Sequence, residues 1–295
     1  MKSYPKTSRT VLIIGLCYLL QACSSSEDSA KQFPIDVMEL TVTDIQNAYS
    51  SGHYSVIDLT QAFLDHIALY ENTYNSFISM NPNVMDMAST LDAERKAGKI
   101  RSALHGVPIV IKDNIDQEGL VTTAGFSGFS AATGGVDMIP GDDAAVVERL
   151  LEAGAIILGK TNLPDFAGDG TRTKSSVSGT TLNAYDVTKA PGGSSGGTAT
   201  AVNASFAVLG LGTETGGSIQ NPAGAQALVG VKPTFGLVPL EGVVPINATY
   251  IDVVGPLAKT VYDAAITLDI IAGPSHEDLA TFASIGKTPP NGYTD

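Results

Sequence analysis

Apolar residues recur at helical spacing in the first well-patterned segment of the chain. Between residues 55 and 70 the apolar positions 56, 57, 59, 63, 64 and 67 lie on one face of a helix. A second, more polar helix is predicted over residues 85–97. The acidic pair Asp142-Asp143 is typical of a helix start and predicts a helix that runs to Glu152. A further helix is predicted over residues 197–203.

Short apolar runs rich in β-branched residues predict buried strands between these helices. One run covers residues 106–111 and ends directly before Lys112. The runs 155–158 and 206–211 each follow a predicted helix. Alternation of this kind implies α/β layering, in which helices cover a largely buried sheet.

The beginning of the chain has a different pattern. Three basic residues, Lys2, Lys6 and Arg9, precede an apolar run over residues 11–20. This run is shorter than the ~20 residues that a membrane-spanning helix needs, so it is typical of a secretory signal. The sequence that ends at Cys23, Leu-Gln-Ala-Cys, resembles a bacterial lipobox. An ordinary signal peptide with a coincidental cysteine is the alternative.

This interpretation divides the chain into three parts. We expect a lipoprotein signal peptide over residues 1–22, a lipidated polar tether over residues 23–34, and a folded domain over residues 35–295. Lipidation would occur on Cys23. The protein would then be an exported bacterial lipoprotein, anchored to a membrane and facing the periplasm or the cell exterior.

Composition narrows the possible functions. The 295 residues are 43% hydrophobic, which is enough for a sizeable core. A formal net charge of -13 opposes a nucleic-acid partner, because phosphates would be repelled. Cleavage would remove Cys17 and acylation would block Cys23, so thiolate chemistry and disulfides are excluded. The sequence has neither a metal-ligand cluster nor a nucleotide-binding loop, so we expect no cofactor and no metal.

Lys112 is the first candidate for chemistry, because it directly follows a predicted buried strand. Lysine is rarely buried unless it is paired or functional. Burial lowers the pKa of a lysine, and a neutral lysine can act as a general base. The alternatives are that Lys112 reaches solvent at the strand end or pairs with Asp113.

The second candidate segment is Gly192–Gly197, where Ser194 and Ser195 stand among four glycines directly before a predicted helix. Glycine permits close approach of a ligand to the backbone. The segment also fits the G-x-S-x-G nucleophile elbow of α/β hydrolases, which needs an acid and then a histidine downstream. Only His276 follows, and a plain flexible loop is the remaining alternative.

The third candidate segment covers residues 212–219. Its successive amides at Thr215, Gly216, Gly217 and Ser218 can form a nest that binds an oxyanion, with Ser218 placed as the nucleophile. A structural glycine turn after a strand is the alternative. None of the four histidines neighbours a Gly-Ser motif, so the segments together predict a serine nucleophile with a lysine base.

In this order, the segments 111–114, 192–197 and 212–219 resemble the hallmark segments of the amidase signature family. Further matches lie at 122–125, 154–162 and 230–234, and the likeness covers roughly residues 59–273. Residues 212–218 look most like the branch that contains peptide amidases. The resemblance implies an α/β fold with helices on both faces of a mixed, largely buried sheet. Because family members are usually much longer, we expect the C-terminal part of this fold to be missing.

The resemblance also implies a Ser-Ser-Lys triad. Lys112 matches the basic lysine of the family, and Ser218 matches its nucleophile. Ser194 matches the bridging serine, which in the family follows a cis peptide bond, here the bond from Gly193. The resemblance further assigns Thr215, Gly216 and Gly217 to the oxyanion hole and a supporting role to Ser195.

Two positions depart from the family pattern. Many members have Asp before Thr-Gly-Gly-Ser and Arg two residues after the serine, whereas this chain has Glu214 and Gln220. The charged partnership that usually supports the nucleophile loop is therefore altered.

The activity implied by the resemblance is hydrolysis of a carboxamide through an acyl-enzyme. The substrate would be a small-molecule or peptide amide. One alternative is a catalytically impaired fragment or a binding lipoprotein, which the missing C-terminal part favours. A less favoured alternative is the cytoplasmic amidotransferase component that hydrolyses glutamine for aminoacyl-tRNA, because the signal segment and the negative charge oppose it.

Overall fold

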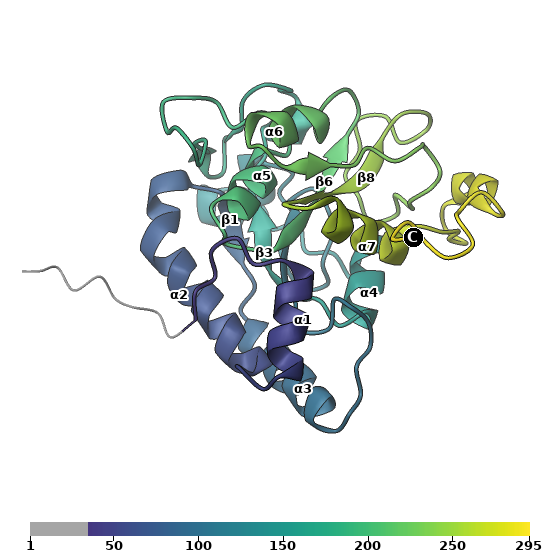
Figure 1. Ribbon diagram of the computed structural model, residues 1–295. Helices are drawn as coiled ribbons and strands as arrows, with labels where there is room; N and C mark the ends of the chain where they lie inside the picture. Colours follow the sequence, from purple (N-terminus) through teal and green to yellow (C-terminus); the bar gives the residue numbers. More distant parts are fainter. Residues whose placement is uncertain (1–34) are drawn as a thin grey trace, which may run out of the picture. The chain divides into compact units, whose positions relative to one another are not determined.

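The structure is a computed structural model that describes residues 35–295 as one unit (Figure 1). The predicted signal peptide, the tether and the lipidation of Cys23 lie outside the described residues. Within residues 35–295, no helix is both long enough and apolar enough to cross a membrane.

A six-stranded mixed sheet forms the centre of this unit. In spatial order its strands are β1 (Phe77–Met80), β3 (Ile156–Thr161), β2 (Pro108–Lys112), β6 (Leu209–Glu214), β8 (Val253–Ala258) and β7 (Val229–Gly230). Strand β2 runs parallel to β3 and β6, whereas β1, β8 and β7 are antiparallel to their neighbours. Two short strands, β4 (Lys174–Ser175) and β5 (Gly179–Thr180), form a separate hairpin.

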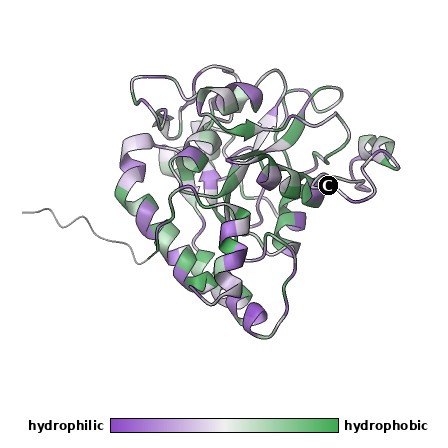
Figure 2. Ribbon diagram, viewed as in Figure 1, coloured by the Kyte–Doolittle hydropathy of each residue, from purple (hydrophilic) through white to green (hydrophobic). Residues whose placement is uncertain are grey.

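Helices pack around this sheet, as the alternating pattern predicts. They are α1 (Val42–Ser50), α2 (Val56–Tyr74), α3 (Val84–Lys96), α4 (Ala145–Glu152), α5 (Gly196–Asn203), α6 (Gln220–Ala225) and α7 (Val261–Ile271). Helix α5 contacts β2, β3, β6 and β8, α3 contacts β3, and α7 contacts β7 and β8. The central strands are mostly apolar, whereas α1, α2 and α3 mix apolar and polar residues (Figure 2). Short 3₁₀ turns cover Ser127–Phe129, Ala131–Thr133, Asp165–Ala167 and Leu279–Ser284.

Local sequence explains where the predicted first helix begins. Ser55 caps α2: its side chain accepts from the Asp58 amide at 3.1 Å, and the Asp58 carboxylate accepts from the Ser55 amide at 2.9 Å. Such a capping box satisfies amides that lack partners inside the helix. The helix predicted for residues 55–70 is confirmed, and it continues to Tyr74.

Three predicted boundaries were wrong. Asp142 and Asp143 do not start α4, which begins at Ala145, because the Asp143 carboxylate instead accepts from the amide of Glu118 at 2.7 Å. Strand β6 begins at Leu209 and extends to Glu214, so the strand takes in the start of the third candidate segment. Strand β3 extends to Thr161 and thereby buries Lys160 inside the sheet.

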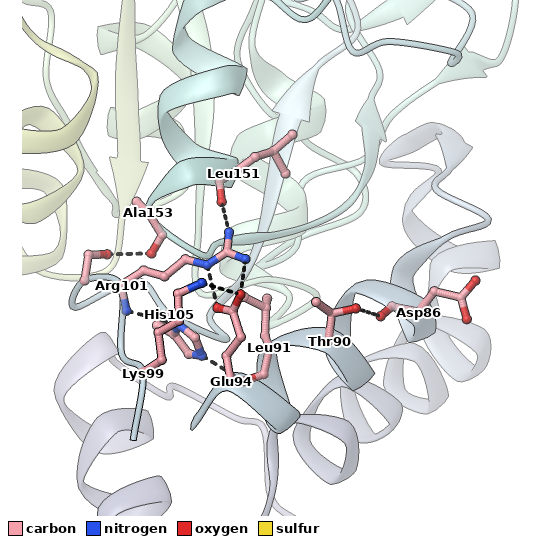
Figure 3. A network of polar contacts seen from close by, with 10 residues as sticks. Asp86, Thr90, Leu91, Glu94, Lys99, Arg101, His105, Leu151 and Ala153 are labelled. Atoms are coloured by element: carbon pink, nitrogen blue, oxygen red, sulfur yellow. Dashed lines mark hydrogen bonds and ion pairs between the residues drawn. The ribbon is translucent and has the colours of Figure 1, made fainter. Parts of the chain in front are cut away.

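A polar network fixes the connection from α3 into β2 (Figure 3). The Arg101 guanidinium donates to Glu94 at 2.6 Å and to the carbonyl of Leu151 at 2.9 Å. The buried ring of His105 bonds the Leu91 carbonyl through Nε2 at 2.9 Å and accepts from the Arg101 amide at Nδ1. Both nitrogens of His105 are therefore engaged in holding the chain that leads to Lys112.

Candidate active site

The side chain of Lys112, at the end of β2, is fully buried. Its Nζ donates to Ser194 Oγ at 2.7 Å and to Thr213 Oγ1 at 2.8 Å, and it lies 3.3 Å from the Thr213 carbonyl oxygen. The two alternatives for Lys112, a solvent-reaching side chain and a pair with Asp113, are therefore wrong. Strands β2 and β6 are parallel neighbours, so Lys112 and Thr213 meet at the carboxyl ends of these two strands.

Asp113 pairs with a second buried lysine. Its carboxylate lies 3.1 Å from Lys160 Nζ, and both side chains are fully shielded from solvent. The Thr123 amide and hydroxyl also donate to Asp113. Lys160 in turn donates to the hydroxyl of Thr122 at 2.5 Å. The negative charge that follows Lys112 in the sequence is thus balanced by Lys160.

Burial lowers the pKa of Lys112 to about 7, because desolvation penalises the ammonium form. The charges of Asp252 and Glu214 act in the opposite direction and are outweighed. A buried amine that is neutral near physiological pH can accept a proton from the hydroxyl it contacts. That hydroxyl is the one on Ser194.

The turn before α5 carries Ser194 and Ser195. The peptide bond between Gly193 and Ser194 is cis, as the resemblance implies. Ser195 Oγ donates to the Thr213 carbonyl at 3.1 Å and accepts from the Thr213 amide at 3.2 Å. The Ser195 amide donates to the carbonyl of Ser218 at 3.2 Å. Ser195 therefore ties the serine turn both to β6 and to the segment that carries Ser218.

Close packing of this turn on β6 requires a glycine at position 212. A Cβ atom on Gly212 would lie 2.7 Å from Ser195 Oγ and 2.7 Å from a methyl carbon of Leu257. Any larger residue there would push the serine turn away from the strand. The glycine therefore preserves the short distance between the two segments.

Ser218 follows the predicted oxyanion stretch, Thr215–Gly217, and lies two residues before the start of α6 at Gln220. Its side chain is almost buried, and it lines the same pocket as Ser194. The backbone of Gly217 has a φ of +104°, which glycine adopts readily. Among residues 35–295, no hydrogen bond uses the amides of Gly216 or Gly217 as donors. These two donors remain available to an anion.

Glu214 supports the segment that carries Ser218. Its Oε2 atom accepts from the Ile219 amide at 2.8 Å and from the Gln220 amide at 2.9 Å. One carboxylate oxygen thus binds two amides at the start of α6, where helix amides lack internal partners. Glu214 supports the loop through the backbone, while the side chain at Gln220 is exposed.

A small pocket joins these groups. Its free volume of about 10 Å³ is that of a single water-sized group beside Ser218. The lining residues are Asn114, Ala167, Ser194, Thr213, Thr215, Ser218, Leu240, Val243, Val244, Ile246, Asp252 and Val253. Polar groups therefore face an apolar wall formed mainly by residues 240–246.

Three residues of this site were not singled out from the sequence. Thr213 contacts Lys112, and the Asn114 side chain donates through Nδ2 to Thr213 Oγ1 at 3.2 Å. Both lie inside segments whose motifs mark them as functional, so their positions beside Lys112 and Glu214 were the available signal. Asp252 lies in a segment without any motif, and only the pairing of β8 with β6 brings it to the pocket.

No histidine is among the residues that line the pocket. His276, which the nucleophile-elbow alternative needs, packs its ring 5.6 Å from that of Phe282. His66 bonds the Ala204 carbonyl and contacts the ring of Tyr70. Within the part of the chain that the structure describes, no cluster of three His, Cys, Asp or Glu side chains is placed to hold a metal ion.

Comparisons with known proteins give a consistent result. A family model described as Amidase matches residues 58–291. A glutamyl-tRNA(Gln) amidotransferase subunit from Alkaliphilus metalliredigens is 38% identical over 258 residues, covering 87% of this chain and 50% of that protein. The protein of the same name from Symbiobacterium thermophilum is 42% identical over 256 residues, covering 85% of this chain and 50% of that protein.

Solved structures share the fold. The native peptide amidase from Stenotrophomonas maltophilia superimposes with a TM-score of 0.79 at 38% identity, covering 89% of this chain and 52% of that one. An amidase family protein from Bacillus anthracis gives a TM-score of 0.81 at 35% identity, covering 88% and 51%. The chain spans about half the length of the curated relatives it matches. Sequence, fold and family model agree that the chain belongs to the amidase signature family.

Proposed function

We propose that this protein hydrolyses carboxamide bonds, with Ser218 as the nucleophile, Ser194 as a proton relay and Lys112 as the base. The observation that carries the proposal is the 2.7 Å hydrogen bond from the buried Lys112 amine to Ser194, in the pocket that Ser218 also lines. A serine hydroxyl is a weak nucleophile until a base removes its proton. Lys112 is the buried amine beside this serine pair, and its pKa is lowered to about 7.

The reaction proceeds in two halves. Ser218 Oγ attacks the carbonyl carbon while its proton passes to Ser194 Oγ, and the Ser194 proton passes to neutral Lys112. The resulting oxyanion accepts hydrogen bonds from the backbone amides of the Thr215–Gly217 stretch. Collapse of the intermediate breaks the C–N bond, and the relay returns the proton to the leaving amine. Water then attacks the acyl-enzyme by the same route and releases the acid.

The substrate class that fits best is a small-molecule or peptide amide. The similarity to the peptide amidase from Stenotrophomonas maltophilia supports it. A second candidate is the activity of the relatives named as glutamyl-tRNA(Gln) amidotransferase subunits, which the 38% and 42% identities favour. The net charge of -13 opposes a tRNA partner.

The test is covalent labelling of Ser218 by a fluorophosphonate probe, together with turnover of a panel of peptide amides, aryl amides and glutamine. We expect the wild-type chain to be labelled, and Ser218→Ala to lose both labelling and turnover. Ser51→Ala, at an exposed serine that follows α1, is the control. Normal labelling of Ser218→Ala would overturn the assignment, and turnover of glutamine alone would favour the second candidate.

Export and a lipid anchor form a separate part of the proposal. The basic start, the apolar run and the Leu-Gln-Ala-Cys sequence ending at Cys23 support them. Wild type should sediment with membranes, and Cys23→Ser should not. Identical fractionation of the two chains would contradict a lipid anchor at this cysteine.

A further inference from the structure

Asp252 is a carboxylate in the pocket that the proposed mechanism does not use. It directly precedes β8, and the pairing of Glu214 with Val253 places Asp252 opposite Thr215 at the end of the β6–β8 ladder. The side chain is only 6% exposed and lines the pocket with Ser194 and Ser218. A buried carboxylate needs strong partners, so its contacts indicate its role.

Three donors from two segments converge on this carboxylate. Thr215 Oγ1 donates to Oδ1 at 2.5 Å. The amides of Ile246 and Asn247 donate to Oδ2 at 2.8 and 2.7 Å. Because both oxygens accept hydrogen bonds from other segments, Asp252 is suited to hold those segments in place.

The backbone that donates to Asp252 belongs to a segment whose residues Val244 and Ile246 form part of the apolar wall of the pocket. At its other end, the Val244 amide donates to the Asn114 carbonyl at 2.8 Å, and the Asn114 side chain donates to the Val244 carbonyl at 3.1 Å. The segment over residues 244–247 is thus held by Asn114 at one end and by Asp252 at the other.

We propose that Asp252 is a positioning residue, whose carboxylate holds Thr215, at the start of the oxyanion stretch, against the backbone of residues 246 and 247. The inference rests on the proposed amidase function, since positioning has a meaning only for a reaction at Ser218. A second consequence is electrostatic. Asp252 and Glu214 are the charges that favour the protonated form of Lys112, while the nearby Asp113 charge is balanced by Lys160.

Two variants separate the mechanical role from the charge. Thr215→Val removes the hydroxyl that Asp252 holds and leaves the carboxylate in place. We expect kcat to fall on the order of 10- to 100-fold, with little change in KM and no shift of the pH profile. Asp252→Asn keeps a group of the same shape, which can accept from the Ile246 and Asn247 amides and donate to Thr215. Without the charge, the acidic limb of kcat/KM should move to lower pH.

A third variant tests the shared contact. Asp252→Ala should lower kcat by at least as much as Thr215→Val, because it also frees the Ile246 and Asn247 amides. The double variant should be no worse than Asp252→Ala alone, because both single changes break the Thr215–Asp252 hydrogen bond. Additive losses, or an acidic limb that stays fixed in Asp252→Asn, would overturn the proposal. A purely structural role would lower stability without moving that limb.

Hydrogen exchange gives a readout that does not depend on turnover. The amides of Ile246 and Asn247 should lose protection in Asp252→Ala and keep it in Thr215→Val. If the wild-type chain is neither labelled at Ser218 nor active, the proposed function fails. Loss of amide protection at Ile246 and Asn247 in Asp252→Ala would then still show that Asp252 holds this segment, and unchanged protection would refute it.

Discussion

The Nζ atom of Lys112 lies 2.7 Å from the Oγ atom of Ser194, although 82 positions separate the two residues in the sequence. Burial at the end of β2 removes Lys112 from water, and the turn before α5 places Ser194 within hydrogen-bond reach. The same burial that lowers the pKa of Lys112 makes it a usable base. Site geometry and electrostatics therefore have one physical origin.

Replacing Lys112 should reduce turnover severely. Lys112→Met keeps much of the side-chain length but has no group that accepts a proton, so we expect kcat to fall on the order of 10²- to 10⁴-fold. Turnover and the rate of fluorophosphonate labelling measure the effect. The exposed residue Lys96 supplies the control variant, Lys96→Met, which should retain full activity. A Lys112→Met enzyme with wild-type rates would refute the base assignment.

The pH profile should report the titration of Lys112. The base works only when neutral, so kcat/KM should rise with pH and level off above about 7. Ser218 labelling should follow the same curve, because it depends on the same base. A rate that falls as pH rises through this range would contradict a lysine base.

The free energy of unfolding should also depend on pH through the titration of Lys112. The pKa of Lys112 is about 7 in the folded state and near its ordinary 10.5 in the unfolded chain, so the unfolded state binds more protons between these values. The contribution of Lys112 to the free energy of unfolding is therefore complete above about 10.5 and is lost as pH falls to about 7. Urea unfolding at several pH values should show a steeper rise in wild type than in Lys112→Met. Parallel curves would show that the amine is not titrating as proposed.

Lys160 should be a major contributor to stability. Lys160→Met leaves the fully buried carboxylate of Asp113 without its counter-ion, so we expect a loss of about 3–5 kcal/mol in the free energy of unfolding. Arg172→Met is the matched control: it breaks a pair with Asp169 in which the Arg172 side chain is 75% exposed, and should cost about 0–1 kcal/mol. Equal losses in the two variants would mean that burial of the Lys160 pair is unimportant.

Glu214 should act through the two amides that it binds. Glu214→Ala removes their acceptor and should lower kcat on the order of tenfold or more, because the loop that carries Ser218 loosens. Glu214→Gln keeps an acceptor oxygen and should retain most of the activity, with an acidic limb at lower pH because a charge near Lys112 is gone. Steady-state kinetics on both variants test this prediction. An equal fall in kcat in the two variants would show that the charge of Glu214 matters rather than its hydrogen bonds to the two amides.

Local sequence was sufficient for the elements that depend on local contacts. The apolar runs before Lys112 and around Ile156 predicted β2 and β3, and the helix over residues 55–70 follows from spacing and from its Ser55 cap. Where a side chain found a distant partner, the local pattern failed. Asp143 did not start α4, because its carboxylate accepts a hydrogen bond from the amide of Glu118 instead.

By itself, the sequence determined the family, the α/β layering and the segments that bear Lys112, Ser194 and Ser218, because these depend on periodicity and short motifs. Only the tertiary structure decided which side chains these residues contact. The strand order places β2 between β3 and β6, so Asp113 meets Lys160 and Lys112 meets Ser194. The β6–β8 ladder brings Asp252 to Thr215. Strand order and register are set by packing across the whole sheet, and no short stretch of sequence contains that information.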